Sequence, residues 1–233
     1  MLKQVVKISL ILGLLAKSST VLAAGIILDR SIIDFISTEP PRHDVTVINQ
    51  GDDIAYVKVE VLEVLNPGTE KEERNIITNP EQIQFVASPS KMAIPPGGRK
   101  QVRLVNLAPP GKERIFRINF TPVLPPLEEK TEGLGVKFVV AYQVLALIHP
   151  AQPTENLKIK RDPNSISFYN QGNTYALISN VRQCDKEGKD CQDDLGSKRL
   201  YVGNKMTIPL PYTDTPVTYK LTNFKGSREA TVQ

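Results

Sequence analysis

Apolar and polar residues alternate along many short stretches of this chain, and clusters of turn-forming residues separate the stretches. Residues 56–65 show the alternation clearly, with a valine at every second position from 57 to 61. Because side chains alternate between the two faces of a β-strand, a period of two predicts a strand with one buried face. Many short strands with turn signals at regular spacing predict an antiparallel β-sandwich. The strands expected before residue 149 are 26–35, 43–48, 56–65, 83–86, 91–94, 101–107, 114–123 and 136–148.

A proline-bounded break at residues 149–153 separates this first set of strands from a second set. The break, HPAQP, has two prolines and no apolar period, which is typical of a linker between domains. The two lengths fit two sandwiches of roughly 100 residues each. We therefore expect two domains, residues 24–149 and residues 150–233. The strands expected in the second domain are 157–161, 165–170, 175–181, 205–210 and 215–223.

The stretch GLGVKFVVAYQVLAL, residues 133–147, is apolar on both faces for much of its length. Val136, Phe138 and Val140 share one face, and the apolar run continues beyond them. A long hydrophobic strand is an aggregation hazard unless another element covers or pairs it. The second half, residues 144–148, is expected to close the core of the first domain as an interior strand. The first half needs a cover from outside the domain, so the free protein is expected to cap itself or to self-associate.

The first 23 residues have the pattern of a secretory signal peptide. A basic start precedes an apolar run at 8–16, and small residues lead to a cleavage position after Ala23. The alternative, a membrane anchor, needs about 20 apolar residues, and this run is shorter and stops at Lys17. Cleavage removes three lysines and lowers the formal net charge from +4 to +1. With charges of both signs interspersed, the exported chain lacks the basic pattern typical of nucleic-acid binding.

The chain offers little candidate chemistry. Cys184 and Cys191 flank the sequence DKEGKD, and in an exported protein such a pair predicts a disulfide that closes a small loop. The chain has two histidines, no H-E-x-x-H motif and no G-x-S-x-G motif, so neither a metal centre nor a hydrolase site is expected. Charged runs at 70–74 and 128–130 lie in loops and are expected to be solvated. No enzyme activity and no cofactor are predicted.

Four motifs occur in a fixed order along the first domain. The third motif is the most specific, because it combines Phe-Val, a proline three residues later, Pro-Gly, and a Gln-Val-Arg strand. Together the motifs resemble the periplasmic chaperones of the chaperone–usher pathway, which assemble bacterial pili. Pro150 also falls where this family has its linker proline. The motifs are LDRSIIDF (28–35), VTVINQGDDIAYVKVEV (45–61), FVASPSKMAIPPGGRKQVRLV (85–105) and RIFRINFTPVLPP (114–126).

The resemblance implies two immunoglobulin-like domains in an L-shaped arrangement, located in the periplasm. Pilin subunits are sandwiches that lack their final strand, and such a chaperone lends them a strand by donor-strand complementation. It then delivers the subunits to an outer-membrane usher. Aligned on Pro150, the donor residues fall at Val136, Phe138 and Val140. These are the same three residues that share one face by periodicity.

One family feature is missing from this chain. The family anchors the C-terminal carboxylate of the pilin with an arginine and a lysine, and those positions here are Ile32 and Leu145. Neither can bind a carboxylate, which implies the alternate branch that serves colonisation-factor pili. Arg117 is the first choice among other bases, because its parity is opposite to that of Phe116 and arginine can bind a carboxylate with two hydrogen bonds. An ordinary solvated strand position is an equally open interpretation of Arg117. The candidate anchors are Arg30, Arg114, Arg117 and Lys137.

Two other functions stay open from the sequence. A secreted pilus subunit or adhesion module would carry an N-terminal extension of alternating apolar residues, usually with one incomplete sandwich. Here two complete-looking domains follow the leader almost at once. A secreted hydrolase on a β-sandwich would need acids, a histidine or a nucleophile brought together, and no such set could be assembled from the sequence. The chaperone hypothesis is therefore preferred.

Overall fold

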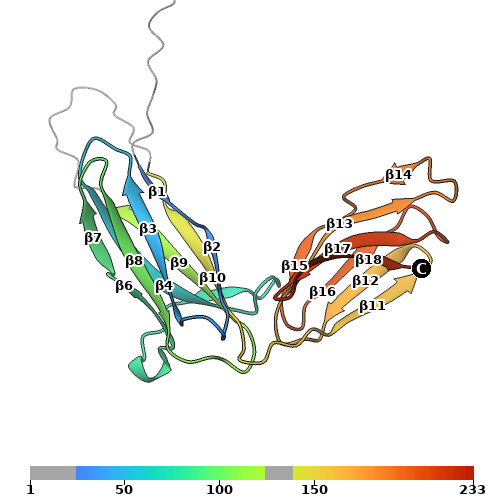
Figure 1. Ribbon diagram of the computed structural model, residues 1–233, viewed down its shortest axis with the longest axis horizontal. Helices are drawn as coiled ribbons and strands as arrows, with labels where there is room; N and C mark the ends of the chain where they lie inside the picture. Colours follow the sequence, from blue (N-terminus) through green and yellow to red (C-terminus); the bar gives the residue numbers. More distant parts are fainter. Residues whose placement is uncertain (1–24, 124–138) are drawn as a thin grey trace, which may run out of the picture.

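A computed structural model of the chain describes residues 25–123 and 139–233. The described chain is mainly strand and forms two sandwich lobes joined at an angle, which confirms the predicted L-shaped arrangement of two immunoglobulin-like domains (Figure 1). The predicted leader, residues 1–23, lies outside the described residues. In the described ranges the single helix is the 3-10 turn η1 (Pro80–Gln82), so no helix there has the length or hydropathy to cross a membrane.

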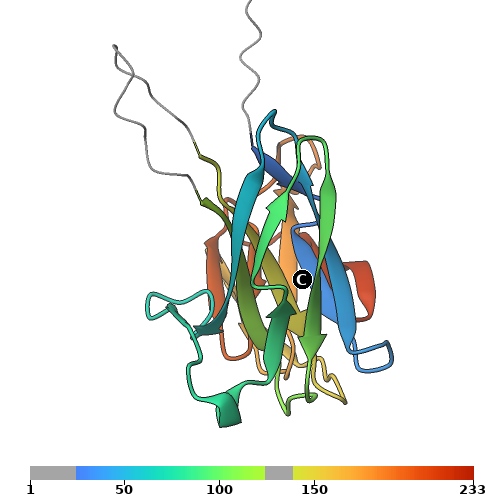
Figure 2. The same ribbon diagram turned by 90° about the vertical axis from the view of Figure 1, so that its left-hand side faces the viewer.

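The first lobe contains two sheets whose strands run side by side along the lobe (Figure 2). One sheet has the order β1 (Ile26–Leu28), β3 (Arg42–Asn49), β8 (Arg99–Asn106), β6 (Phe85–Ser88). The other has the order β2 (Ile32–Phe35), β10 (Tyr142–Ile148), β9 (Arg114–Val123), β4 (Ala55–Leu65), and both β5 (Glu73–Asn75) and β7 (Lys91–Ile94) pair with β4. We call this second sheet the cleft sheet of the first lobe.

The second lobe also contains two sheets. One has the order β11 (Leu157–Asp162), β12 (Ser165–Asn170), β16 (Lys205–Pro209). The other has the order β14 (Cys191–Gln192), β13 (Ala176–Cys184), β17 (Val217–Asn223), β18 (Gly226–Val232), and β15 (Lys198–Leu200) pairs with β13. A disulfide joins Cys184 and Cys191, as predicted, and closes the hairpin between β13 and β14.

Each lobe has its own apolar core, built by the period of two that the sequence shows. Phe116, Ile118 and Phe120 of β9 point inward and are fully buried between the sheets of the first lobe. Ile166 and Phe168 of β12 do the same in the second lobe. Burying each such side chain contributes on the order of 1.5–3 kcal/mol, so these positions stabilise the lobes strongly.

The predicted strand at 26–35 was wrong, because the chain forms two strands there. β1 belongs to one sheet of the first lobe and β2 to the other. The residues between them are polar, and the Asp29 carboxylate accepts a hydrogen bond from the backbone N–H of Thr46, 2.9 Å away. This bond fixes the point at which the chain crosses from one sheet to the other.

The predicted strand at 136–148 is shorter than expected in its described part. β10 begins at Tyr142, and residues 139–141 lie outside any strand. Residues 144–148 are all buried, which confirms their predicted place in the core. The sequence pattern also missed β5, β14, β15 and β18, which are short or largely exposed.

Candidate functional site

The outer edge of β10 is paired along only part of its length. On one side β10 pairs with β9 from Tyr142 to Ile148. On the other side β2 runs parallel to β10, and that pairing begins at Leu145 opposite Ile32. Among the described strands none pairs with this second side at residues 142–144. The structure therefore presents a short length of open strand edge, which can accept an added strand.

The residues that lead into this edge are exposed and apolar. The exposed fractions of Val139 and Val140 are 41% and 51%. Val140 is the one predicted donor residue that the structure describes, and its side chain is free for contact with a partner. The other two, Val136 and Phe138, lie outside the described residues.

The row of residues at the end of the open edge is mostly apolar. Ile32 lies opposite Leu145, and Leu145 lies opposite Arg117 on β9. Val144 and Ala146 point into the core of the first lobe, so Leu145 and its two partners lie on the outer face of the cleft sheet. The two positions where the family has its bases are thus neighbours in space, and both are hydrocarbon side chains.

Arg117 provides the positive charge in this row. Its side chain is half-buried, and its Nε is buried without a hydrogen-bond partner. No carboxylate of the described residues lies within 4.0 Å of its guanidinium. A buried donor without an acceptor costs about 1–3 kcal/mol, so an arriving carboxylate would relieve that cost. Partial burial also argues against a freely solvated position.

The other candidate anchors are engaged elsewhere or lie outside the described residues. Arg30 pairs with Asp29 at 3.2 Å. Arg114 pairs with Glu63 at 2.7 Å, also contacts the Gln84 side chain, and lies over the ring of Phe116. Both therefore have their charge or their hydrogen bonds satisfied within the chain. Lys137 falls in the range that the structure leaves undescribed.

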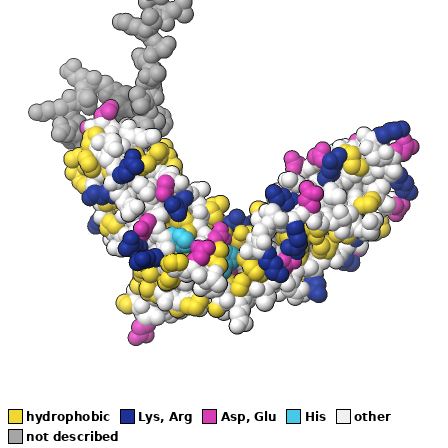
Figure 3. All heavy atoms as spheres, in the orientation of Figure 1, with side chains coloured by type: hydrophobic (Ala, Val, Ile, Leu, Met, Phe, Trp, Pro, Cys, Tyr) yellow, Lys and Arg dark blue, Asp and Glu magenta, His cyan; other side chains and the backbone are white. Residues whose placement is uncertain are grey.

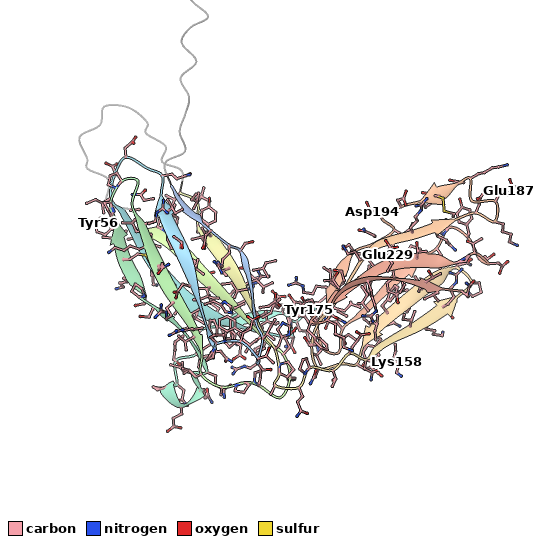
Figure 4. All side chains as sticks on the ribbon, viewed as in Figure 1. Tyr56, Lys158, Tyr175, Glu187, Asp194 and Glu229 are labelled. Atoms are coloured by element: carbon pink, nitrogen blue, oxygen red, sulfur yellow. A yellow bond between two sulfur atoms is a disulfide. The ribbon has the colours of Figure 1, made fainter. Side chains whose placement is uncertain are left out.

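An apolar contact joins the two lobes directly beside this row. We call it the junction cluster: Val64, Ile115, Leu145, Leu147 and Tyr175, with Leu177 and Tyr201 packed against them. Tyr175 comes from the second lobe and lies at the joint (Figure 4). The cluster forms the apolar surface where the two lobes meet. Arg117 lies next to it, because Arg117 pairs with Leu145 of the cluster.

A buried polar contact accompanies the junction cluster, and we call it the hinge cluster: Asp34, Glu113, His149 and Thr174. The ring of His149 is buried, with Nε2 2.8 Å from the Asp34 carboxylate and Nδ1 2.9 Å from the Thr174 hydroxyl. Thr174 donates in turn to the Glu113 carboxylate at 2.7 Å. Both ring nitrogens of His149 thus have a polar partner, Asp34 from the first lobe and Thr174 from the second. The cluster ties residues of the first lobe to Thr174 of the second.

Glu113 is the buried acid of the hinge cluster. Burial raises the pKa of its carboxyl above the usual value, and the hydrogen bonds from Thr174 and from the Tyr175 backbone N–H act in the opposite direction. Burial raises the pKa of the Tyr175 hydroxyl as well. Burial at the junction therefore disfavours the charged forms of the Glu113 carboxyl and the Tyr175 hydroxyl.

The sequence pattern did not identify the hinge and junction clusters. Glu113 and Thr174 are 61 positions apart, so no local spacing connects them. His149 offered the one signal in the sequence, a weak one, because a histidine inside a proline-bounded linker can indicate a polar contact there. Among the described residues, no group of three or more histidine, cysteine, aspartate or glutamate side chains is placed to hold a metal ion.

Comparisons with known proteins agree with this geometry. Residues 25–154 match the family described as pili and flagellar-assembly chaperone, PapD N-terminal domain. A fimbrial protein of the CFA/I system of Escherichia coli is 29% identical over 167 residues, which cover 67% of this chain and 69% of that protein. A fimbrial protein of the CS1 system of Escherichia coli is 29% identical over 172 residues, which cover 69% of this chain and 71% of that protein.

Solved structures show the same two-lobe fold. The class 5 fimbriae chaperone CfaA matches with a TM-score of 0.68 and 24% identity, over 90% of this chain and 99% of that one. A chain of the Salmonella enterica SafA pilin–SafB chaperone complex matches with a TM-score of 0.60 and 15% identity, over 92% of this chain and 98% of that one. The CFA/I and CS1 similarities agree with the predicted colonisation-factor branch. Because the family match spans more than half of its residues, this chain belongs to the pili and flagellar-assembly chaperone family.

Proposed function

We propose that this protein is a periplasmic chaperone that binds pilin subunits by donor-strand complementation and delivers them to an outer-membrane usher. The observation that carries the proposal is the open edge of β10 at residues 142–144, next to exposed Val139 and Val140, in a member of a pilus-chaperone family. A pilin that lacks its last strand presents a complementary open edge and an apolar groove. Backbone hydrogen bonds then supply affinity, and alternate side chains fill the groove.

The bound strand is proposed to run parallel to β10. β2 is already parallel to β10 and begins at Ile32, so an added parallel strand would continue its line. Its C-terminal end would then arrive beside Ser31 and Ile32, at the row that contains Leu145 and Arg117. In the antiparallel direction the same terminus would point away from Arg117. Only the parallel direction brings a terminal carboxylate to the free guanidinium.

The donor side chains are proposed to be Val136, Phe138 and Val140. They share one face by alternation, and the exposure of Val140 supports the assignment for the residue that is described. Arg117 is proposed as the carboxylate anchor and is preferred over Arg30 and Arg114, because each of those two already pairs with a carboxylate of this chain. In the free protein the same open edge favours capping or self-association.

Delivery to the periplasm is proposed to depend on a signal peptide that is cleaved after Ala23. The mature chain would then begin at Ala24 and contain two domains that divide at residues 149 and 150. The basic and apolar pattern of the first residues supports this proposal, and so does the periplasmic location of the family's chaperones. The mass of the protein recovered from the periplasm measures the cleavage position directly.

Phe138→Glu tests the donor-strand assignment. The substitution places a carboxylate where the partner's apolar groove has no counter-charge, so we expect the pilin that is co-exported with the chaperone to be lost from the purified complex. Co-purification from the periplasm measures the effect, and circular dichroism verifies that the variant is folded. Val139→Glu is the matched control, because it makes the same change on the opposite face and should retain the pilin.

Two results would contradict the proposal. If Phe138→Glu and the unmodified chaperone purify with equal amounts of pilin, this face does not fill the groove. If native mass shows a ladder of polymers of this chain instead of one chaperone with one pilin, the chain is itself a component of the pilus.

A further inference from the structure

Arg199 lies on the wall of the second lobe that faces the first lobe. It belongs to β15 and pairs with Leu177 of β13, so the two side chains share a face of their sheet. Leu177 packs against the junction cluster, and this places Arg199 at the border of that cluster. Figure 3 shows Lys and Arg side chains on the second lobe where it borders the hollow between the lobes.

The Arg199 guanidinium is held in place by an aromatic ring. Its central carbon lies 4.7 Å from the centre of the Tyr175 ring. Tyr175 is itself fixed, because it is 8% exposed and its backbone N–H donates to the buried Glu113 carboxylate at 3.1 Å. A guanidinium stacked on a ring keeps its edge N–H groups available for a planar acceptor. The ring therefore positions Arg199 without occupying its hydrogen-bond donors.

Arg199 differs from the other arginines of its lobe in its polar partners. The second lobe, which the structure describes throughout, has four arginines. Arg182 pairs with Asp193, Arg228 pairs with Glu155, and Arg161 donates to backbone carbonyls. Arg199 has neither a carboxylate within 4.0 Å nor a hydrogen bond to any described residue. Its guanidinium therefore has no ion-pair partner among the described residues, and it lies at the border of the junction cluster.

We propose that Arg199 is a second binding residue for the C-terminal carboxylate of the pilin, acting from the second lobe while Arg117 acts from the first. The inference rests on the proposed function, since it takes the same parallel strand end as its ligand. Both guanidiniums border the junction cluster, Arg117 through Leu145 and Arg199 through Leu177. A carboxylate arriving there leaves water for an apolar floor, where charge-assisted hydrogen bonds are strongest. The angle between the lobes would then help to form the site.

A pair of short peptides tests this role in the full mature chain. Both peptides have alternating valine and threonine residues, and they differ only at the C-terminus, which is a free carboxylate in one and a carboxamide in the other. Fluorescence anisotropy gives the preference for the acid over the amide. A charge-assisted hydrogen bond corresponds to about tenfold in affinity, so we expect a clear acid preference that Arg199→Met lowers about tenfold. Methionine keeps an aliphatic stem over Tyr175 while removing the charge.

Lys220→Met is the matched control. Lys220 lies on the same face of the second-lobe sheet but pairs with Ser179 and Glu229, away from the junction cluster, so its loss should leave the acid preference unchanged. Thermal unfolding of each variant verifies that the lobes remain folded.

The possible results distinguish the role of Arg199 from the proposed strand addition at β10. If Arg199→Met keeps the full acid preference while Arg117→Met loses it, the carboxylate is bound from the first lobe alone, and the role of Arg199 is overturned. If the unmodified chain does not prefer the acid, both arginines are excluded as carboxylate anchors, although strand addition at β10 would stand. If Lys220→Met lowers the preference as much as Arg199→Met, the effect is general charge and Arg199 has no specific role.

Discussion

Glu113 shows how a single buried acid can influence the joint between two domains. Its carboxylate accepts hydrogen bonds from the Thr174 hydroxyl and the Tyr175 backbone, and the ring of His149 lies against it, with Nδ1 3.3 Å from its oxygen. Its second oxygen is buried without a partner. Asp34 supplies the other carboxylate that faces His149. Keeping the charge of Glu113 in this joint is costly, because the joint excludes the water that would solvate it.

Glu113→Gln should therefore change the pH dependence of stability. Because burial raises the pKa of this carboxyl in the folded protein, the folded state binds the proton more tightly than the unfolded state. The stabilisation from that proton is present at low pH and is lost as the pH rises through the raised pKa. We expect the variant to gain in unfolding free energy relative to the unmodified protein as the pH rises above 4.5, the ordinary pKa of this carboxyl. Urea unfolding over a series of pH values measures the difference.

Glu155→Gln is the control, because its effect on stability should depend on pH in the opposite direction. Its partner Arg228 lowers the pKa of Glu155, so the stability that this acid supplies is present above its unfolded pKa and is lost as the pH falls through the lowered value. The variant should lose stability relative to the unmodified protein at neutral pH. An identical pH trend for the two variants would show that the Glu113 carboxyl is not held in an environment that favours its neutral form.

At the scale of elements, β10 divides into a buried half and an open half. Leu145 donates its backbone N–H to Ser31, so its N–H points toward β2. Alternation of the backbone then directs the N–H of Gln143 to the same side, where no described strand begins until Ile32. The N–H groups of Tyr142 and Val144 point toward β9. The second side of β10 at residues 142–144 is thus left unpaired among the described strands, and this is the edge proposed to receive the pilin strand.

Gln143→Pro tests the open edge without disturbing the ladder to β9. Proline removes one N–H, and at this position that N–H faces the partner side. We expect binding of the co-exported pilin to weaken roughly three- to tenfold, the value of one net hydrogen bond. Surface plasmon resonance measures the affinity.

Gln143→Ala is the matched control for this substitution. It removes the side-chain hydrogen bond to Asn119 but keeps the backbone N–H, so its affinity should remain near that of the unmodified protein. Equal affinity of the proline and alanine variants would contradict backbone pairing at this edge.

The sequence predicted the elements best where the alternation is complete. β9 and β12 have the predicted bounds, because apolar and polar positions alternate without interruption along most of both strands. The crossing between β1 and β2 was missed, since it depends on a hydrogen bond that the Asp29 carboxylate accepts from Thr46, in a strand that comes later in the chain. β18 was missed because its sequence, GSREATV, is mostly exposed and lacks an apolar period.

The candidate site was also predictable only where local sequence patterns determine the position of a residue. Burial at residues 144–148 follows from a run that is apolar on both faces, and the outward parity of Arg117 follows from a period of two; the structure confirms both. The partners of Arg30 and Arg114 were not predictable, because a salt bridge depends on where the fold brings the acids. The proposed role of Arg199 depends on the angle between the lobes, and no pattern along the chain predicts that angle.

At the scale of the whole molecule, the proposed pilin-binding site takes residues from both lobes and lies at their joint. The first lobe supplies the open strand edge, the second lobe supplies a wall with an unpaired arginine, and the junction and hinge clusters hold the two together. Only the face between the lobes and the open edge should therefore respond to a bound pilin. The outer sheet of the first lobe, with order β1-β3-β8-β6, lies on the far side of the core.

Hydrogen exchange across the whole chain, measured on the free chaperone and on its complex with the co-exported pilin, tests the central claim most directly. We expect the backbone N–H of Gln143 to exchange slowly only in the complex, while amides of β3 and β8 keep their rates. The contrary result is a Gln143 N–H that exchanges equally in both states while protection appears elsewhere. That outcome would show that the pilin does not add a strand to β10.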